Sequence, residues 1–193
     1  MRIISGSARG REIKVSAKAR PYLAKVRAAI FNSLAARLDG AAVLDLYAGS
    51  GVNGIEALSR GAASAVLVDN ARDAAAMMKE NLARCACAEK AEIRLMEVGA
   101  FLRQTRARFD LIFIDPPFTD DEAARARYGE WLNLAGAALR PDGRVIFRRE
   151  IIQPEPPLPT CDLTVARDKN YGRSRVVFYG NKFTTPSANE LPC

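Results

Sequence analysis

The chain contains no histidine and only four cysteines. Without histidine, any mechanism that needs an imidazole base is excluded, including a Ser-His-Asp triad. The cysteines match no zinc-ligand spacing, so we expect no metal and reduced thiols at Cys85, Cys87, Cys161 and Cys193. No apolar run is long enough to span a bilayer, and Met1 leads into no cleavable signal pattern. We therefore expect a cytoplasmic protein.

Acidic residues are nearly absent from the N-terminal segment. Residues 1–27 hold eight Lys and Arg and one acid, so they carry the whole net charge of +7, and the remaining 21 basic and 21 acidic groups cancel. A basic segment on a neutral body is typical of phosphate-backbone binding. Interleaved isoleucines indicate that the segment is ordered rather than a loose tail. The predicted nucleic-acid contacts are Arg2, Arg9, Arg11, Lys14, Arg20 and Arg27; Arg148, Arg149, Lys169 and Arg173 are further candidates whose direction the sequence does not show.

Strand and helix patterns alternate along most of the chain. Apolar runs predict buried strands at 43–46, 65–69, 92–96, 109–114 and 144–147, and helices between them at 52–60, 71–85, 99–105 and 121–139. We expect a β-hairpin over 1–15, a helix over 22–38, and two late strands at 161–166 and 175–179 separated by a loop at 168–173. Such alternation predicts an α/β fold of the Rossmann-like, doubly wound type, with seven strands in a mostly parallel sheet.

The expected domain organisation has three parts. Residues 1–38 form a basic hairpin and helix for RNA docking, residues 39–182 form the catalytic domain, and residues 183–193 form a flexible tail. The proline-rich stretch 153–160 is interpreted as a stiff surface connector inside the second part.

A glycine loop lies between the first strand and the first helix of the alternating region. Gly49, Gly51 and Gly54 fit the pattern G-x-G-x-x-G. Glycines at such a turn allow a cofactor to approach backbone N–H groups at a helix N-terminus. The motif alone is weak, but its strand-to-helix context strengthens it.

Two acids refine the choice of cofactor. Asp69 ends the second strand, where a carboxylate typically accepts hydrogen bonds from ribose hydroxyls. Asp45 stands ahead of the glycines, where it would crowd a pyrophosphate but could help to hold a cationic amino-acid group directly or through water. This arrangement favours S-adenosylmethionine over a nicotinamide dinucleotide.

The tetrad Asp115-Pro116-Pro117-Phe118 follows the fourth strand. Each proline fixes φ and removes a backbone donor, so carbonyl groups remain as acceptors. The Asp115 carboxylate and the Pro116 carbonyl could accept both hydrogens of an exocyclic NH2 group, while the Phe118 ring stacks on a planar base. The alternative is a turn that merely ends a strand; the glycine loop upstream favours the base-binding interpretation.

These residues resemble the class I S-adenosylmethionine-dependent methyltransferases. More specifically, the chain resembles the RsmD-type family of bacterial guanine-N2 methyltransferases of small-subunit ribosomal RNA. The resemblance extends over most of the chain. It runs from Met1–Gly6 to Tyr171-Gly172 and Val176–Tyr179. Its most specific blocks are the opening Arg2-Ile3-Ile4 with Gly10-Arg11, Val26-Arg27 with Phe31-Asn32, Asp45–Gly51, Gly54–Ala62 and Phe109–Phe118.

The resemblance implies a doubly wound sheet whose seventh strand is inserted antiparallel. It implies direct methyl transfer to an amine, with Asp115 to Phe118 as the catalytic residues and ribosomal RNA or the assembling small subunit as partner of a monomer. The cofactor-binding residues implied or predicted are Asp45, Tyr47, Ala48, Gly49, Ser50, Gly51, Gly54, Asp69, Asn70 and Glu97.

The chain also departs from the family pattern, which leaves alternatives open. Residues 22–28 lack the threonine and the acids that the family usually has there, and Asp69 occupies a position that is usually glutamate. Glu97 could only substitute for the usual Asp-Ala, and Val52-Asn53 occupies positions where the family has small or apolar residues. An N6-adenine DNA methyltransferase would use the same tetrad, although no target-recognition domain is visible. A non-catalytic nucleic-acid-binding paralogue is a second alternative, and an NAD-dependent oxidoreductase is a third.

Overall fold

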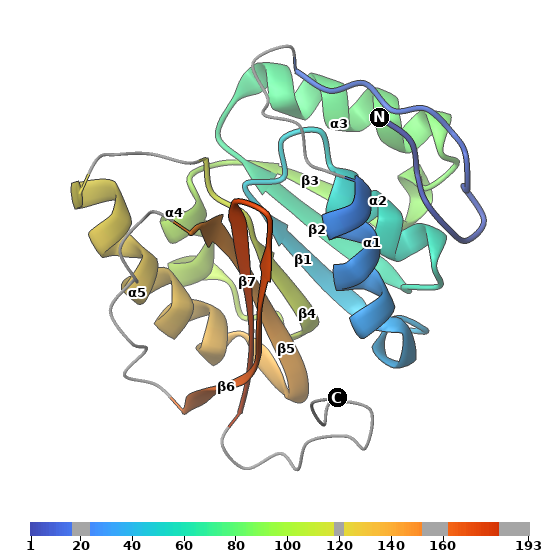
Figure 1. The fold of residues 1–193 in the computed structure, drawn as a ribbon. Coiled ribbons are helices and arrows are strands. Elements are labelled where there is room, and N and C mark those ends of the chain that lie inside the picture. Colours follow the sequence, from blue (N-terminus) through green and yellow to red (C-terminus); the bar gives the residue numbers. More distant parts are fainter. Residues whose placement is uncertain (17–23, 118–121, 152–161, 182–193) are drawn as a thin grey trace. The chain divides into compact units, whose positions relative to one another are not determined.

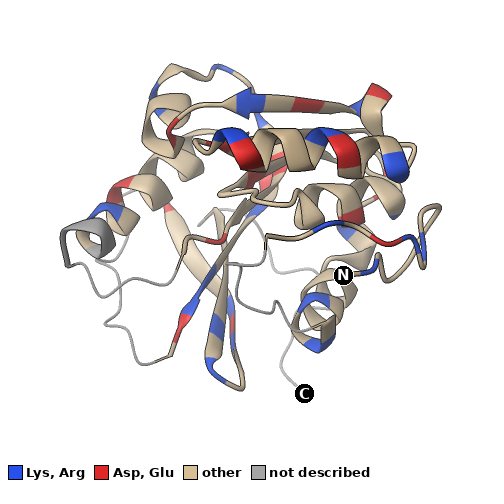
Figure 2. Ribbon diagram, turned by 90° about the horizontal axis from the view of Figure 1, so that it is seen from above, with Lys and Arg blue, Asp and Glu red and all other residues tan. Residues whose placement is uncertain are grey.

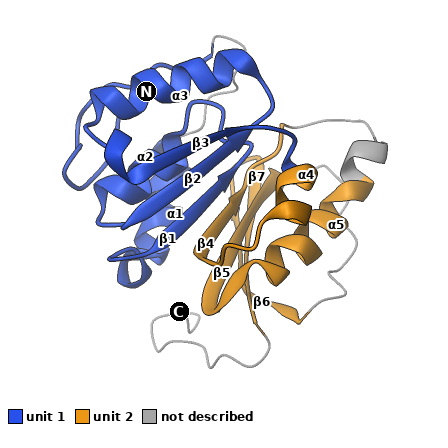
Figure 3. Cartoon of the chain, turned by 180° about the vertical axis from the view of Figure 1, so that it is seen from behind, with its two compact units in different colours: residues 1–98 blue, residues 99–193 orange. Residues whose placement is uncertain are grey.

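The computed structural model describes residues 1–16, 24–117, 122–151 and 162–181. The chain divides into two compact units, Met1–Val98 and Gly99–Cys193 (Figure 3). None of the helices formed by the described residues is long and apolar enough to cross a membrane.

Unit 1 is built on three parallel strands in the order β3-β2-β1. Because both crossovers run in the same direction and are right-handed, helices α2 and α3 lie on one face of these strands (Figure 1). The core is made by the apolar residues of β1 and β2, such as Val43, Leu44 and Leu67. The elements are α1 (Ala24–Ser33), the short 3-10 helix η1 (Ala35–Arg37), β1 (Ala42–Leu46), α2 (Val52–Ser59), β2 (Ser64–Asp69), α3 (Arg72–Arg84), the 3-10 helix η2 (Ala88–Lys90) and β3 (Ala91–Leu95).

Unit 2 contains four strands in the order β4-β5-β7-β6. Strand β4 (Phe109–Ile114) is parallel to β5 (Leu139–Glu150), whereas β7 (Ser174–Asn181) is antiparallel to both β5 and β6 (Leu163–Tyr171). The implied antiparallel insertion of the last strand is therefore confirmed. Helix α4 (Val98–Gln104) spans the boundary of the units, and α5 (Glu122–Ala137) connects β4 to β5, packing Tyr128 edge-on against Phe147.

The predicted elements and the observed ones agree closely except in four places. The strand predicted at 144–147 is the longer β5, Leu139–Glu150. The segment 1–15 forms one antiparallel bridge, Arg2 with Glu12, rather than two paired strands. The helix expected over 22–38 is α1 followed by η1. The loop expected at 168–173 is wrong, because β6 continues to Tyr171 and pairs with β7 up to Ser174. The connector 153–160 and the tail 183–193 lie outside the described residues.

Candidate functional site

The loop between β1 and α2 is shaped by left-handed backbone conformations. Gly51 precedes the first residue of α2 with a φ of 76°, and its N–H donates to the Ala48 carbonyl over 2.7 Å. Tyr47 adopts a φ of 60°, which is uncommon for a bulky side chain. Strain of this kind persists where the surroundings enforce it and concentrates at ligand-binding sites.

The two later glycines of the loop lie in close contact with β2. A Cβ on Gly54 would lie 2.8 Å from Leu67 Cδ2, and one on Gly51 would lie 3.0 Å from the same atom. Both glycines therefore let α2 pack directly on β2, the third-glycine role in a dinucleotide-type turn.

Asp45 supports this loop from beneath. Its carboxylate is fully buried, accepts the Gly54 N–H over 3.0 Å, and lies 3.5 Å from the Asn53 amide nitrogen. With no exposed surface, Asp45 is placed to orient the start of α2. Its charge also complements the positive end of the helix.

Asp69 ties the glycine loop to the end of β2. Its Oδ2 accepts the Gly49 N–H over 2.8 Å, and its Oδ1 accepts the Ala71 N–H over 3.0 Å. A Cβ on Gly49 would meet only the Tyr47 carbonyl oxygen at 3.9 Å, so space is open at this glycine. An open glycine beside a partly exposed carboxylate fits the ribose end of a nucleoside cofactor.

The other predicted cofactor-binding residues fall into two groups. Ser50 belongs to the loop and its carbonyl accepts a hydrogen bond from the buried Asn81 amide over 2.9 Å. Ala48 is buried in the same loop, whereas Asn70 and Glu97 are exposed after the ends of β2 and β3. Their place at the carboxyl ends of parallel strands is where ligands of such folds bind.

In unit 2, strand register places Asp115 beside Arg148. Ile114 of β4 pairs with Phe147 of β5, and the next residues on the two strands form an ion pair with Nε and Oδ1 2.7 Å apart. Burial raises the pKa of the Asp115 carboxyl, and the Arg148 charge and hydrogen bond oppose that rise. Arg148 was a candidate nucleic-acid contact on the sequence alone; its partner is instead the acid of the tetrad.

The rest of the tetrad is only partly described. Pro116 is buried and Pro117 is exposed, which fits a rigid turn directly after β4. Phe118, predicted to stack on a base, lies outside the described residues.

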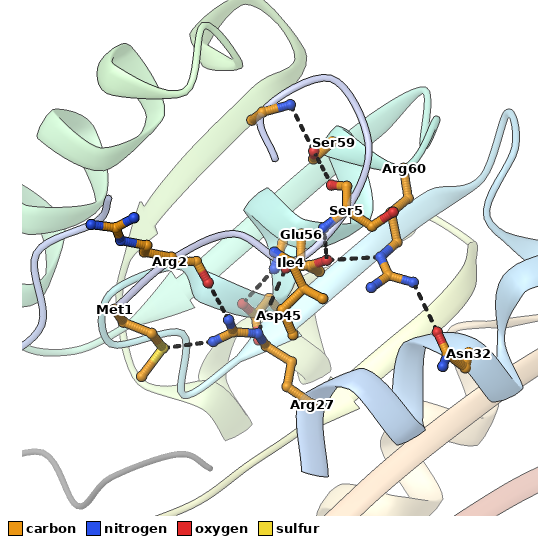
Figure 4. A network of polar contacts seen from close by, with 12 residues as sticks. Met1, Arg2, Ile4, Ser5, Arg27, Asn32, Asp45, Glu56, Ser59 and Arg60 are labelled. Atoms are coloured by element: carbon orange, nitrogen blue, oxygen red, sulfur yellow. Dashed lines mark hydrogen bonds and ion pairs between the residues drawn. The ribbon is translucent and has the colours of Figure 1, made fainter. Parts of the chain in front are cut away.

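The basic N-terminal segment is anchored to α2 by a buried polar network (Figure 4). The Glu56 carboxylate, itself fully buried, accepts the N–H groups of Ile4 and Ser5 over 2.9 and 3.1 Å. Ser59 adds to this contact, because its hydroxyl donates to the Ser5 carbonyl over 2.6 Å. The segment is therefore held in place as part of unit 1, as the interleaved isoleucines predicted.

Two arginines pair with the carboxylate of this network. Arg60 Nε lies 2.8 Å from Glu56, and Arg27 Nε lies 3.6 Å from it. Arg27 is fully buried and also donates to the Arg2 carbonyl and, over 2.6 Å, to the Met1 sulfur. Because its guanidinium has no exposed surface, Arg27 is removed from the predicted nucleic-acid contacts.

The other predicted basic contacts stay at the surface. Arg2, Arg9, Arg11 and Lys14 are exposed, and blue segments mark the trace that begins at the N-terminus in Figure 2. Lys14 pairs with Glu80 over 2.7 Å, and Arg11 donates to the Arg84 carbonyl. Arg20 lies outside the described residues, and Arg149 in unit 2 is buried, which removes it from the further candidates.

Cys85 and Cys87 are buried with free thiols. Burial raises the pKa of both thiols, so they are not activated nucleophiles. Cys161 and Cys193 are outside the described residues. Within the described ranges, His, Cys, Asp and Glu form no group of three or more that could hold a metal ion.

Comparison with known proteins places this site in a family. The family model Conserved hypothetical protein 95 matches residues 1–180. YlbH of Bacillus subtilis, named as a candidate rRNA methyltransferase, is 35% identical over 93% of this chain and 98% of its own length. Ribosomal RNA small subunit methyltransferase D of Escherichia coli is 40% identical over 61% of this chain and 60% of its own length.

Solved structures agree with this assignment. A candidate methyltransferase of Escherichia coli, yhhF, superimposes with a TM-score of 0.81 at 32% identity, covering 94% of this chain and 97% of its own. A candidate methylase from Haemophilus influenzae gives a TM-score of 0.74 at 29% identity, covering 93% and 97%. The predicted Rossmann-like α/β fold is confirmed. The chain belongs to the Conserved hypothetical protein 95 family, the RsmD-type family of class I S-adenosylmethionine-dependent methyltransferases.

Proposed function

We propose that this enzyme transfers a methyl group from S-adenosylmethionine to the exocyclic N2 amine of a guanine in small-subunit ribosomal RNA. The observation that carries the proposal is the largely buried carboxylate of Asp115, directly after β4, in a chain that is 40% identical over its matched part to a protein named small-subunit rRNA methyltransferase D. Four further relatives carry the same name, at 30–40% identity.

The loop of unit 1 would hold the cofactor. Asp69 would bind the ribose hydroxyls, and the open space at Gly49 would admit the nucleoside against the backbone. Asp45 would keep Gly54 and the start of α2 in place. When bound, S-adenosylmethionine supplies a methyl group activated by a sulfonium leaving group.

Asp115 would hold the amine to be methylated. Its carboxylate is an acceptor for an N–H of the amine, and the Pro116 carbonyl is the proposed acceptor for the other. Accepting both hydrogens orients the amine and draws its lone pair out of conjugation with the base. Because direct displacement needs no covalent intermediate and no strong base, the main contribution of the protein is positioning, a large entropic term. A guanine held inside a helix would have to be extruded first.

The anchored N-terminal segment would bind phosphates. Arg2 and Arg9 are exposed on a segment fixed to α2, so their charges keep a defined geometry. Defined positive charge suits a folded ribonucleoprotein better than sequence reading in a duplex. RNA binding should weaken steeply as salt rises, because each phosphate contact releases counterions.

Methyl transfer to isolated substrates tests the proposal. Tritiated methyl groups would be followed from S-adenosylmethionine to small ribosomal subunits that lack base methylation, with naked rRNA and unmethylated DNA in parallel. We expect N2-methylguanine in small-subunit RNA after nucleoside analysis. N6-methyladenine in DNA alone would overturn the substrate, and no transfer to any of them, with cofactor bound, would overturn the activity.

A further inference from the structure

The Asp115 carboxylate is held by an arginine that lies on the neighbouring strand. Arg148 Nε is 2.7 Å from Asp115 Oδ1, and the two side chains are only 16% and 14% exposed. Arg148 Nη1 also lies 3.3 Å from the Ser174 hydroxyl of β7, so the guanidinium is fixed from two strands. An ion pair that is this well buried and doubly held is screened little by solvent.

The contact uses one of the two carboxylate oxygens. A carboxylate has two oxygens and about four lone-pair positions. Arg148 binds Oδ1 through Nε, which fixes the plane of the carboxylate while Oδ2 keeps its acceptor capacity. The ionised carboxylate is the better acceptor for an amine, because protonation turns one of its oxygens into a donor. In a site with so little exposure, a nearby positive charge favours the ionised form.

We infer that Arg148 is a positioning residue for the amine acceptor, which keeps Asp115 ionised and orients it so that Oδ2 faces the incoming base. This inference rests on the proposed role of Asp115 in methyl transfer. It assigns to Arg148 a specific task in the reaction instead of the phosphate contact that its charge suggests on the sequence alone.

Among the described residues, two other acids of these strands have arginine partners of their own. Glu150, two residues along β5, lies 2.5 Å from Arg173, and Asp110 near the start of β4 lies 2.7 Å from Arg140. Tyr128 of helix α5 packs on Phe147, the residue before Arg148. Because successive side chains of a strand point to opposite faces, Arg148 points away from this contact. The positive charge that acts on the Asp115 carboxyl is that of Arg148.

Arg140 provides a matched control. It forms an ion pair with Asp110 at the opposite end of the same two strands, again over 2.7 Å. Arg140→Met therefore removes an Arg–Asp pair from β4 and β5 without touching Asp115. Arg148→Lys keeps the positive charge but loses the planar guanidinium that binds both Asp115 and Ser174.

The test is the titration of the Asp115 carboxyl carbon by NMR in protein labelled at aspartate, with the signal assigned by its loss in Asp115→Asn. We expect Arg148→Met to raise the pKa of Asp115 by about one pH unit or more, Arg148→Lys to raise it less, and Arg140→Met to leave it unchanged. An unchanged pKa in Arg148→Met would overturn the inference. If Arg148→Met does not fold, Arg148→Gln, which also removes the charge, takes its place, and an unchanged pKa in that variant would overturn the inference.

The pH profile of methyl transfer is the second readout. The acid limb of kcat/KM should move to higher pH in Arg148→Met, giving about a tenfold loss at a fixed pH on that limb for each pH unit by which the limb moves. A purely structural arginine would change thermal stability and leave the limb in place, which would also contradict the inference. Absence of activity in the wild-type enzyme would reject the proposed function alone, because the NMR titration needs no substrate.

Discussion

The backbone N–H of Gly49 donates to the carboxylate of Asp69 over 2.8 Å, which joins the glycine loop after β1 to the end of β2. One acid therefore shapes the loop and, in the proposed function, binds the ribose of the cofactor. Both tasks depend on the same two oxygens, so the affinity for the cofactor should be sensitive to this side chain.

Replacing Asp69 by alanine should weaken S-adenosylmethionine binding by about tenfold or more, since a hydrogen bond to a charged acceptor contributes roughly 1.5–3 kcal/mol. Titration calorimetry measures the change in Kd. Asp73→Asn is the control, because Asp73 is exposed in the first turn of α3 and only accepts the N–H of its neighbour Ala74. Equal affinities of wild type and Asp69→Ala would rule out the ribose role.

Gly6 touches α2 so closely that no side chain fits. A Cβ there would lie 1.7 Å from the Ser59 carbonyl oxygen, and the φ of Gly6 is +82°. We expect Gly6→Ala to lower the free energy of unfolding by more than about 3 kcal/mol, because backbone must move. Gly10→Ala measures the cost of the left-handed backbone conformation alone. The φ of Gly10, +80°, is similar to that of Gly6, but nothing lies within 4 Å of an added Cβ. That variant should lose about 1 kcal/mol. Similar urea midpoints for the two variants would contradict the close contact.

Glu56 forms ion pairs with both Arg27 and Arg60 inside unit 1. Removing its charge with Glu56→Gln leaves the fully buried Arg27 without its carboxylate, so we expect a loss of roughly 3–5 kcal/mol in the free energy of unfolding. Glu80→Gln breaks the exposed pairs with Lys14 and Arg84 and should leave the unfolding midpoint nearly unchanged. A midpoint for Glu56→Gln that matches that of Glu80→Gln would show that the network does not hold the N-terminal segment.

Because the pKa of Asp115 is raised in the folded protein, ionisation of this carboxyl lowers the free energy of unfolding. The group starts from an ordinary value of 3.8, and burial raises it more than Arg148 lowers it. Since the folded form binds its proton more tightly than the unfolded form, this carboxyl stabilises the fold below pH 3.8, and that stability is lost as pH rises through the folded-state pKa.

Asp115→Asn removes this titration. The stability of Asp115→Asn relative to wild type should therefore rise between pH 4 and pH 7, by about 1.4 kcal/mol for each pH unit by which the folded-state pKa exceeds the unfolded one. Urea unfolding of both proteins at the two pH values measures the difference. A difference that falls over this range would mean that the pKa of Asp115 is lowered in the folded protein.

Much of the fold and the centres of both sites could be predicted because their signals are local. The strand β4 was predicted with its observed bounds, Phe109–Ile114, since all of its residues except Asp110 are apolar and buried. The glycine loop and Asp69 were found because glycine spacing and strand ends are visible in the sequence. Strand β6 was predicted too short because most of its residues are exposed, so it shows little apolar alternation.

The partners of charged residues could not be predicted. Arg27 counted as a surface charge because the sequence does not show that Glu56, 29 positions away, lies beside it in the core. Arg148 was missed as a partner of Asp115 for the same reason, since the pairing depends on the register between β4 and β5. Both ion pairs join residues that are far apart in the sequence and meet only through the packing of strands and helices. Composition and motif spacing carry no information about such pairs.

The most direct test of the proposed mechanism is the initial rate of methyl transfer by Asp115→Ala, measured on small ribosomal subunits together with S-adenosylmethionine affinity. We expect turnover to be abolished while the cofactor Kd stays within about twofold of wild type, because Asp115 acts on the amine and not on the cofactor. Full activity in this variant would contradict the mechanism.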